Sequence, residues 1–82
     1  MKETFVEKDL VEYIAKTLVD DPSAVVVNAI EGDKATILEL KVSEGDIGKV
    51  IGKHGRIAKA MRTLLSASST RSGKRVTLEI QP

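Results

Sequence analysis

The most informative stretch of this 82-residue chain is Val50-Ile51-Gly52-Lys53-His54-Gly55-Arg56-Ile57. Two glycines flank two polar residues, an apolar pair precedes them, and an apolar-periodic segment follows. Because glycine has no Cβ, another backbone can approach it closely. A turn that leads into a helix also presents free backbone N–H groups and the positive end of the helix dipole. The stretch therefore predicts a loop that seats an anionic backbone among positive charges.

The N-terminal segment predicts a helix over residues 5–19. An apolar stripe repeats there at helical spacing, and its members are Val6, Leu10, Val11, Ile14 and Leu18. We expect this stripe to face the core, and both aromatic side chains, Phe5 and Tyr13, to be buried or half-buried. The helix ends at Asp20-Asp21-Pro22, because a residue that precedes proline disfavours the α conformation.

A β-hairpin is predicted next. β-Branched residues dominate 24–30, and Glu31-Gly32-Asp33-Lys34 has the composition of a turn. The segment 35–42 then alternates, with Leu38, Leu40 and Val42 on one face. One apolar and one largely polar face indicate a sheet that helices cover on one side only.

The loop itself separates two predicted helices. The first starts near Ser43, carries Ile47, Val50 and Ile51 inward and stops at Gly52. The second begins at Gly55, and 66–73 is interpreted as a fraying end and a loop. A last strand over 75–80 completes the order α-β-β-α-α-β. We therefore predict an α+β fold: a mixed three-stranded sheet, its last strand parallel to the second, with three helices on one face.

Length and composition limit the function classes. Eighty-two residues predict a single domain over 1–82. The chain has no cysteine and one histidine, so we expect no disulfide, no metal site and no cofactor. The N-terminus does not resemble a signal peptide, and no stretch approaches the roughly 20 apolar residues of a membrane span. A soluble, cytoplasmic setting is the expectation.

Charge is divided unevenly along the chain. Residues 1–41 hold five Lys/Arg and nine Asp/Glu, a balance of −4, whereas residues 42–82 hold eight and three, a balance of +5. Five basic residues and no acidic one lie between Lys49 and Arg62, both included. The asymmetry predicts a basic face for a polyanion, and the alternative is a merely solvated helix face.

The chain resembles a type II KH domain. The order of elements matches over nearly the whole length, and the segment Asp46-Ile47-Gly48-Lys49-Val50-Ile51-Gly52-Lys53-His54-Gly55-Arg56-Ile57 matches the family's core signature. The length makes it similar to stand-alone bacterial single-KH proteins of the KhpA type. The resemblance implies binding of short single-stranded RNA in a GxxG-loop groove, as an RNA chaperone or post-transcriptional regulator. It also implies a homodimer, or a heterodimer with a larger KH-containing protein.

The resemblance also assigns residues. Gly52 and Gly55 would shape the loop, and Lys53 and His54 would sit at its tip against the sugar–phosphate chain. The floor and walls of the groove would come from Ile47, Val50, Ile51 and Ile57, and the loop around Arg71 and Lys74 would form the opposite rim. Among the remaining cations we predict phosphate contacts by Arg56 and Lys49, and we interpret Arg62 as surface.

One other function class remains open, and a second is not expected. A phosphate loop for nucleotide hydrolysis is not expected, because only three residues separate Gly48 from Gly52 and His54 stands where a Ser or Thr is needed. We therefore expect no enzyme activity. A protein–protein adaptor with little RNA affinity is the alternative, because the helix after the loop has an apolar arc of about 160° at 3.6 residues per turn. Its candidate interface residues are Met61, Leu64 and Leu65.

Overall fold

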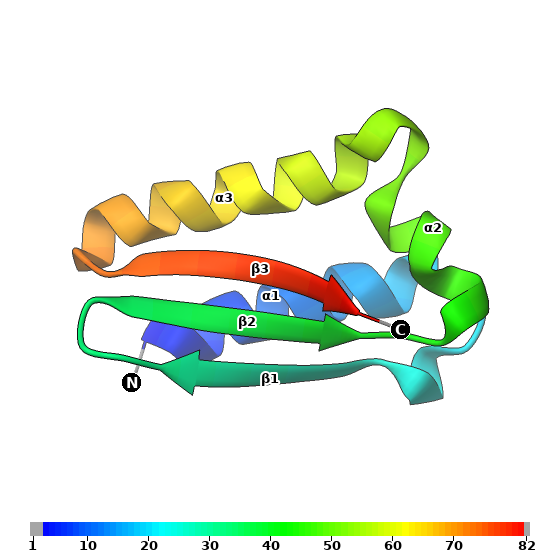
Figure 1. Ribbon diagram of the computed structural model, residues 1–82, viewed down its shortest axis with the longest axis horizontal. Helices are drawn as coiled ribbons and strands as arrows, with labels where there is room; N and C mark the ends of the chain where they lie inside the picture. The colour runs from blue at the N-terminus through cyan, green and yellow to red at the C-terminus, as the bar shows by residue number, and fades with distance from the viewer. Residues whose placement is uncertain (1–2, 82) are drawn as a thin grey trace.

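The computed structural model describes the backbone of residues 3–81 and the side chains of residues 6–67 and 73–81. Within that range a three-stranded sheet carries three helices on one face (Figure 1). The elements are α1 (Glu3–Leu18), β1 (Val26–Glu31), β2 (Ala35–Lys41), α2 (Ile47–Ile51), α3 (Arg56–Ser72) and β3 (Arg75–Gln81). Short 3₁₀ turns at Pro22–Ala24, Glu44–Asp46 and Lys53–Gly55 connect them. The predicted order and the α+β class are confirmed.

The sheet has the order β1-β2-β3. β1 pairs antiparallel with β2, with Val26 opposite Lys41, and β2 pairs parallel with β3, with Ala35 opposite Arg75. The residues that point toward the helices are buried: Thr36, Leu38 and Leu40 on β2, and Val76 and Leu78 on β3. The alternation along both strands thus places the core between the sheet and the helices, as predicted.

The buried face of α1 differs from the predicted stripe. Val11 and Ala15 are fully buried, whereas Val6 and Leu10 are exposed and the Tyr13 side chain is 73% exposed. The apolar arc of this helix is wider than its contact with the sheet and α3. The helix is rotated so that small side chains face the sheet, which lets the two backbones approach closely. The expectations for Val6, Leu10 and Tyr13 were therefore wrong, and the Phe5 side chain lies outside the described residues.

α3 is longer than the sequence predicted. Residues 66–72 continue the helix instead of forming a loop, because no glycine or proline interrupts them and the helix lies along β3. Gly73, at φ 76°, ends it with the left-handed conformation typical of a C-terminal cap. Met61 and Leu65, both essentially inaccessible, anchor α3 in the core.

Candidate nucleic-acid interface

The 52–55 loop begins at a position that only glycine can occupy. Gly52 has φ 81° and ψ 168°, and its N–H closes α2 by donating to the carbonyl of Gly48 at 2.9 Å. A Cβ added there would lie 2.6 Å from Cγ1 of Ile57. Two independent constraints therefore apply at Gly52: a backbone conformation that L side chains rarely adopt, and contact with the first turn of α3.

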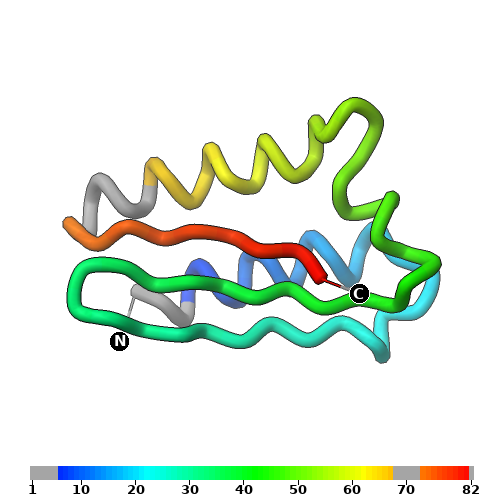
Figure 2. The backbone as a smooth tube through the Cα atoms, viewed as in Figure 1, coloured from blue at the N-terminus to red at the C-terminus, as the bar shows by residue number. Residues whose placement is uncertain are grey.

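The second half of the loop is also left-handed. His54 has φ 58° and ψ 25°, and Gly55 has φ 72°. A Cβ at Gly55 would meet nothing within 4 Å, so the backbone angle is the one constraint on its identity. These angles fold the chain into a hook that leaves α2 and enters α3, and Figure 2 shows it projecting at one end of the molecule.

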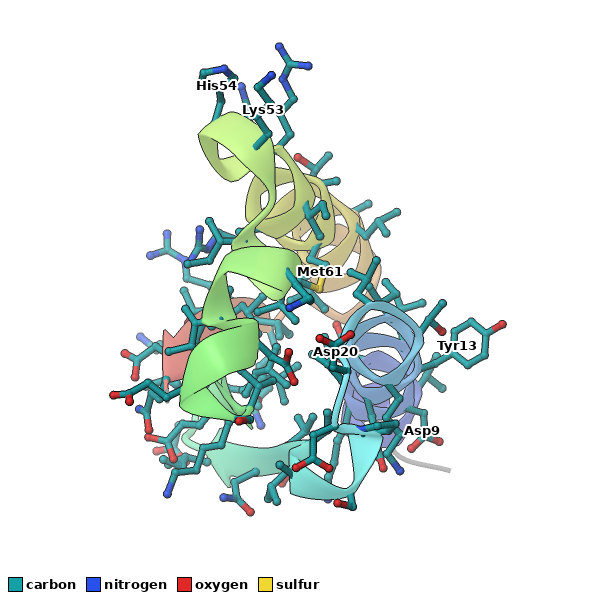
Figure 3. The ribbon with its side chains drawn as sticks, turned by 90° about the vertical axis from the view of Figure 1, so that its right-hand side faces the viewer. Asp9, Tyr13, Asp20, Lys53, His54 and Met61 are labelled. Carbon is teal, nitrogen blue, oxygen red and sulfur yellow. The ribbon has the colours of Figure 1, made fainter. Side chains whose placement is uncertain are left out.

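The loop leaves backbone donors at its tip. The N–H of Gly55 donates to the carbonyl of Gly52 at 3.0 Å, and the N–H of Arg56 donates to the carbonyl of Lys53. Neither bond uses the N–H of Lys53 or of His54. Both of these side chains are exposed and project from the top of the molecule (Figure 3). Since α3 starts at Arg56, its positive dipole end adds to the positive charges of Lys53 and Arg56.

The apolar residues around the loop divide into two groups. Ile47, Ile51 and Ile57 are half-buried, so part of each side chain remains available to a ligand. Val50 is fully buried within the core. It therefore supports the groove from beneath, and the prediction that it lines the groove as a contact residue does not fit the structure.

Lys49 has a structural role that the sequence did not reveal. Its Nζ lies 3.2 Å from Asp20 Oδ2 and 3.3 Å from Asp46 Oδ1. Hydrogen bonds and the charges of both carboxylates, Asp20 first, raise the pKa of Lys49. The ammonium ties the end of α1 to the start of α2, so its charge is already compensated. The role of Lys49 as a third phosphate contact stays a prediction, although two carboxylates already engage its ammonium.

Asp46 is the centre of this junction. Its side chain is buried, and Oδ2 accepts a hydrogen bond from the N–H of Asp21 at 3.1 Å. Burial opposes the charged form, but hydrogen bonds from the backbone of Asp21 and Asp20 and from Lys49 outweigh it, so that the pKa of the Asp46 carboxyl lies below its usual value. The junction thus fixes α2, and with it the loop, relative to α1.

Arg56 and Arg62 point in different directions from α3. Arg56 lies on the outward side of α3, where it lines a shallow hollow with Lys59, Ala60, Thr63 and Leu64. Arg62 reaches the other way, and its Nη2 donates to the carbonyl of Leu78 on β3 at 3.4 Å. The turn between α3 and β3 lies at the far end of α3 from the loop (Figure 1), about 25 Å away at 1.5 Å per residue. Its part in the opposite rim of the groove stays a prediction.

The geometry of the loop between α2 and α3 agrees with the family to which the sequence belongs. Residues 8–80 match the KH domain of KhpA/KhpB. This chain is a member of the KhpA/KhpB KH-domain family. The chain is 55% identical to the RNA-binding protein KhpA of Borreliella burgdorferi over 80 residues, which is 98% of each chain. It is 58% identical to the RNA-binding protein KhpA of Clostridium perfringens over 73 residues, 89% of this chain and 97% of that protein.

A solved structure supports the fold independently. The crystal structure of an Era variant from Aquifex aeolicus, bound to GDP and aluminium fluoride, superposes with a TM-score of 0.60. The match covers 98% of this chain and 31% of Era, at 22% identity. At that identity the likeness concerns the fold alone. The KhpA/KhpB KH fold of this chain thus recurs as a small part of a longer protein.

The part of the chain that the structure describes has neither a membrane-spanning helix nor a cluster of metal ligands. Its helices are too short or too polar to cross a bilayer. Its His, Asp and Glu side chains do not gather in groups of three that could hold a metal ion.

Proposed function

We propose that this chain binds single-stranded RNA at the 52–55 loop and the adjoining groove. The observation that carries the proposal is the loop tip, which precedes the N-terminus of α3, carries two exposed side chains and leaves the N–H groups of Lys53 and His54 out of the hydrogen bonds found in the loop. An RNA phosphate fits this arrangement of donors and positive charge. The names of the relatives, RNA-binding protein KhpA at 55–58% identity, support the same class of ligand.

The groove holds bases by apolar contact in this proposal. Ile51 and Ile57 flank the loop and are half-exposed, so unstacked bases can lie against them while Lys53 and Arg56 face the phosphates. The aromatic residue Tyr13 lies on α1, away from the loop (Figure 3), and provides no stacking platform for these bases. A loop of this size clamps about four nucleotides. We infer weak to moderate affinity, as suits an RNA chaperone or post-transcriptional regulator that acts in the cytoplasm without catalysis.

A second candidate function is assembly. Leu64 is 50% exposed on α3, and the exposed Val6, Leu10 and Tyr13 lie on the neighbouring α1. α1 and α3 are in contact, and exposed apolar side chains on neighbouring elements can form a patch of the kind that marks an interaction site. We propose that α1 and α3 meet a second copy of the chain or a larger KH-containing protein. Met61 and Leu65 are buried and are removed from the predicted interface.

Fluorescence anisotropy with labelled RNA octamers tests the principal proposal. We expect binding of an unstructured octamer, weaker binding of the same sequence in a duplex, and a log–log salt slope of roughly −2 to −3 for about four phosphates. Tighter binding to the duplex, or an affinity indifferent to salt, would contradict the groove assignment. The adaptor alternative predicts an assembled protein that binds neither RNA.

A further inference from the structure

Arg62 occupies an unusual position on α3. The neighbouring Met61 is buried, and Arg62 lies 100° further round the helix, on the flank that faces β3. The hydrogen bond from its Nη2 to the carbonyl of Leu78, 3.4 Å long, fixes this direction. The side chain therefore spans from the helix to the sheet beside the proposed groove, although it is exposed.

The carbonyl of Leu78 lies on the open edge of the sheet. β3 is the edge strand, and it pairs with β2 through its odd-numbered residues, since Arg75 donates to Lys34 and Gln81 accepts from Val42. The backbone groups of the even-numbered residues, Leu78 and Ile80 among them, consequently point away from β2. Arg62 thus places a guanidinium between α3 and the open edge of the sheet.

The charge of Arg62 is not compensated by a carboxylate within the described side chains. The ion pairs found among those residues involve Lys16 and Lys49, and Arg62 takes part in none of them. A guanidinium has five N–H donors in a planar fork, and the bond to Leu78 uses one. Several donors therefore remain for a ligand in the groove.

We propose that Arg62 reads a guanine base in the bound RNA, an inference that rests on the proposed function. The loop tip holds the phosphates, and Arg62 lies about one and a half helical turns beyond Ile57, on the side of the sheet edge. In this arrangement, a base that lies on the half-buried Ile51 and Ile57 would turn its polar edge toward the sheet edge where Arg62 lies. Two parallel N–H groups of Arg62 match the O6 and N7 acceptors of guanine, whereas adenine presents a donor at the position of O6.

The test compares four labelled octamers in fluorescence anisotropy. An octamer of uridine is the reference, and the others carry guanosine, 7-deazaguanosine or adenosine at the fourth position. We expect the wild-type protein to prefer guanosine over adenosine by about tenfold, and to lose most of this preference with 7-deazaguanosine, which lacks N7. The variants Arg62→Gln and Arg62→Lys should bind the guanosine and adenosine octamers within about twofold of each other. Their far-UV circular dichroism should match that of the wild type.

Lys59→Gln is the matched control, because it removes one positive charge from the outward side of α3. It should keep the guanosine preference. A wild-type protein that binds all octamers equally would refute the role of Arg62 and leave RNA binding intact, whereas one that binds none would refute both. A uniform loss of affinity in Arg62→Gln, with a salt slope shallower by about 0.7, would identify Arg62 as a phosphate contact and overturn the inference.

Discussion

Gly52 and Ile57 are in contact across the loop that joins α2 to α3. The space that a Cβ on Gly52 would need is filled by Cγ1, Cβ and Cδ1 of Ile57, all within 2.9 Å of that position. The first apolar residue of α3 therefore packs directly on the backbone at the end of α2. The loop is held from its base by this contact, so its tip can remain exposed without losing its conformation.

The two loop glycines should differ in their effect on stability. Gly52→Ala combines a left-handed backbone with a steric clash, and we expect a loss of roughly 2–4 kcal/mol in the free energy of unfolding. Gly55→Ala meets open space and should lose only about 1 kcal/mol, the cost of its positive φ. Urea unfolding of the two variants measures the difference. Equal losses would show that Ile57 moves aside at little cost.

Reversal of charge at the loop tip should abolish RNA binding without unfolding the protein. Lys53→Asp with His54→Asp places two carboxylates where phosphate is proposed to sit, while both positions are exposed. We expect anisotropy with the uridine octamer to show at least a tenfold loss of affinity. Lys34→Asp with Asn28→Asp is the control, since it changes exposed residues of the hairpin by the same net charge. An unchanged affinity in the loop variant would remove the 52–55 loop from the binding site.

Asp46 should make stability depend on pH in the acid range. Its pKa is lowered in the folded protein, so the unfolded chain binds the proton more readily, and acid favours unfolding. The stabilisation by the carboxylate is complete above the ordinary value of 3.8 and is lost as pH falls below it through the folded pKa. Urea midpoints between pH 7 and pH 2 should therefore decline less in Asp46→Asn than in the wild type. Parallel declines of the urea midpoint in the two proteins would show that the Asp46 carboxylate contributes nothing to the pH dependence of stability.

Much of the fold was predictable because local patterns and tertiary packing agree. The alternation of Leu38, Leu40 and Val42 left one possible buried face, and Gly52 and Gly55 marked the loop between two helices. α1 was different, because its apolar residues cover more of the helix than the sheet can bury. The periodicity of its apolar residues predicts that α1 is a helix but not which side of the helix faces the core. The prediction that Tyr13 is buried or half-buried was therefore wrong.

The candidate site was predictable where chemistry is local and not where it depends on distant partners. Lys53 and His54 lie at the loop tip as expected, since their neighbours in sequence determine their exposure. Lys49 is separated by 29 positions from Asp20, and Arg62 by 16 from Leu78, so neither contact has a sequence signal. The burial of Glu7, whose Oε2 has no hydrogen-bond partner among the described residues, likewise had no signal in the sequence.

The adjacent residues Leu64 and Leu65 provide the sharpest test of assembly. Leu64 is 50% exposed and Leu65 is 1% exposed, although both are leucines on the same helix. If α1 and α3 form the interface, Leu64→Asp places a charge in it and should give a folded monomer, while Leu65→Asp buries a charge in the core and should unfold the protein. Analytical ultracentrifugation of the wild type and of Leu64→Asp, with circular dichroism of all three proteins, makes the comparison.

Tyr13→Asp should act like Leu64→Asp, because Tyr13 lies on the other helix of the proposed interface. A wild type that sediments as a monomer up to high concentration would exclude the homodimer and leave a different KH-containing protein as the partner to be tested by mixing.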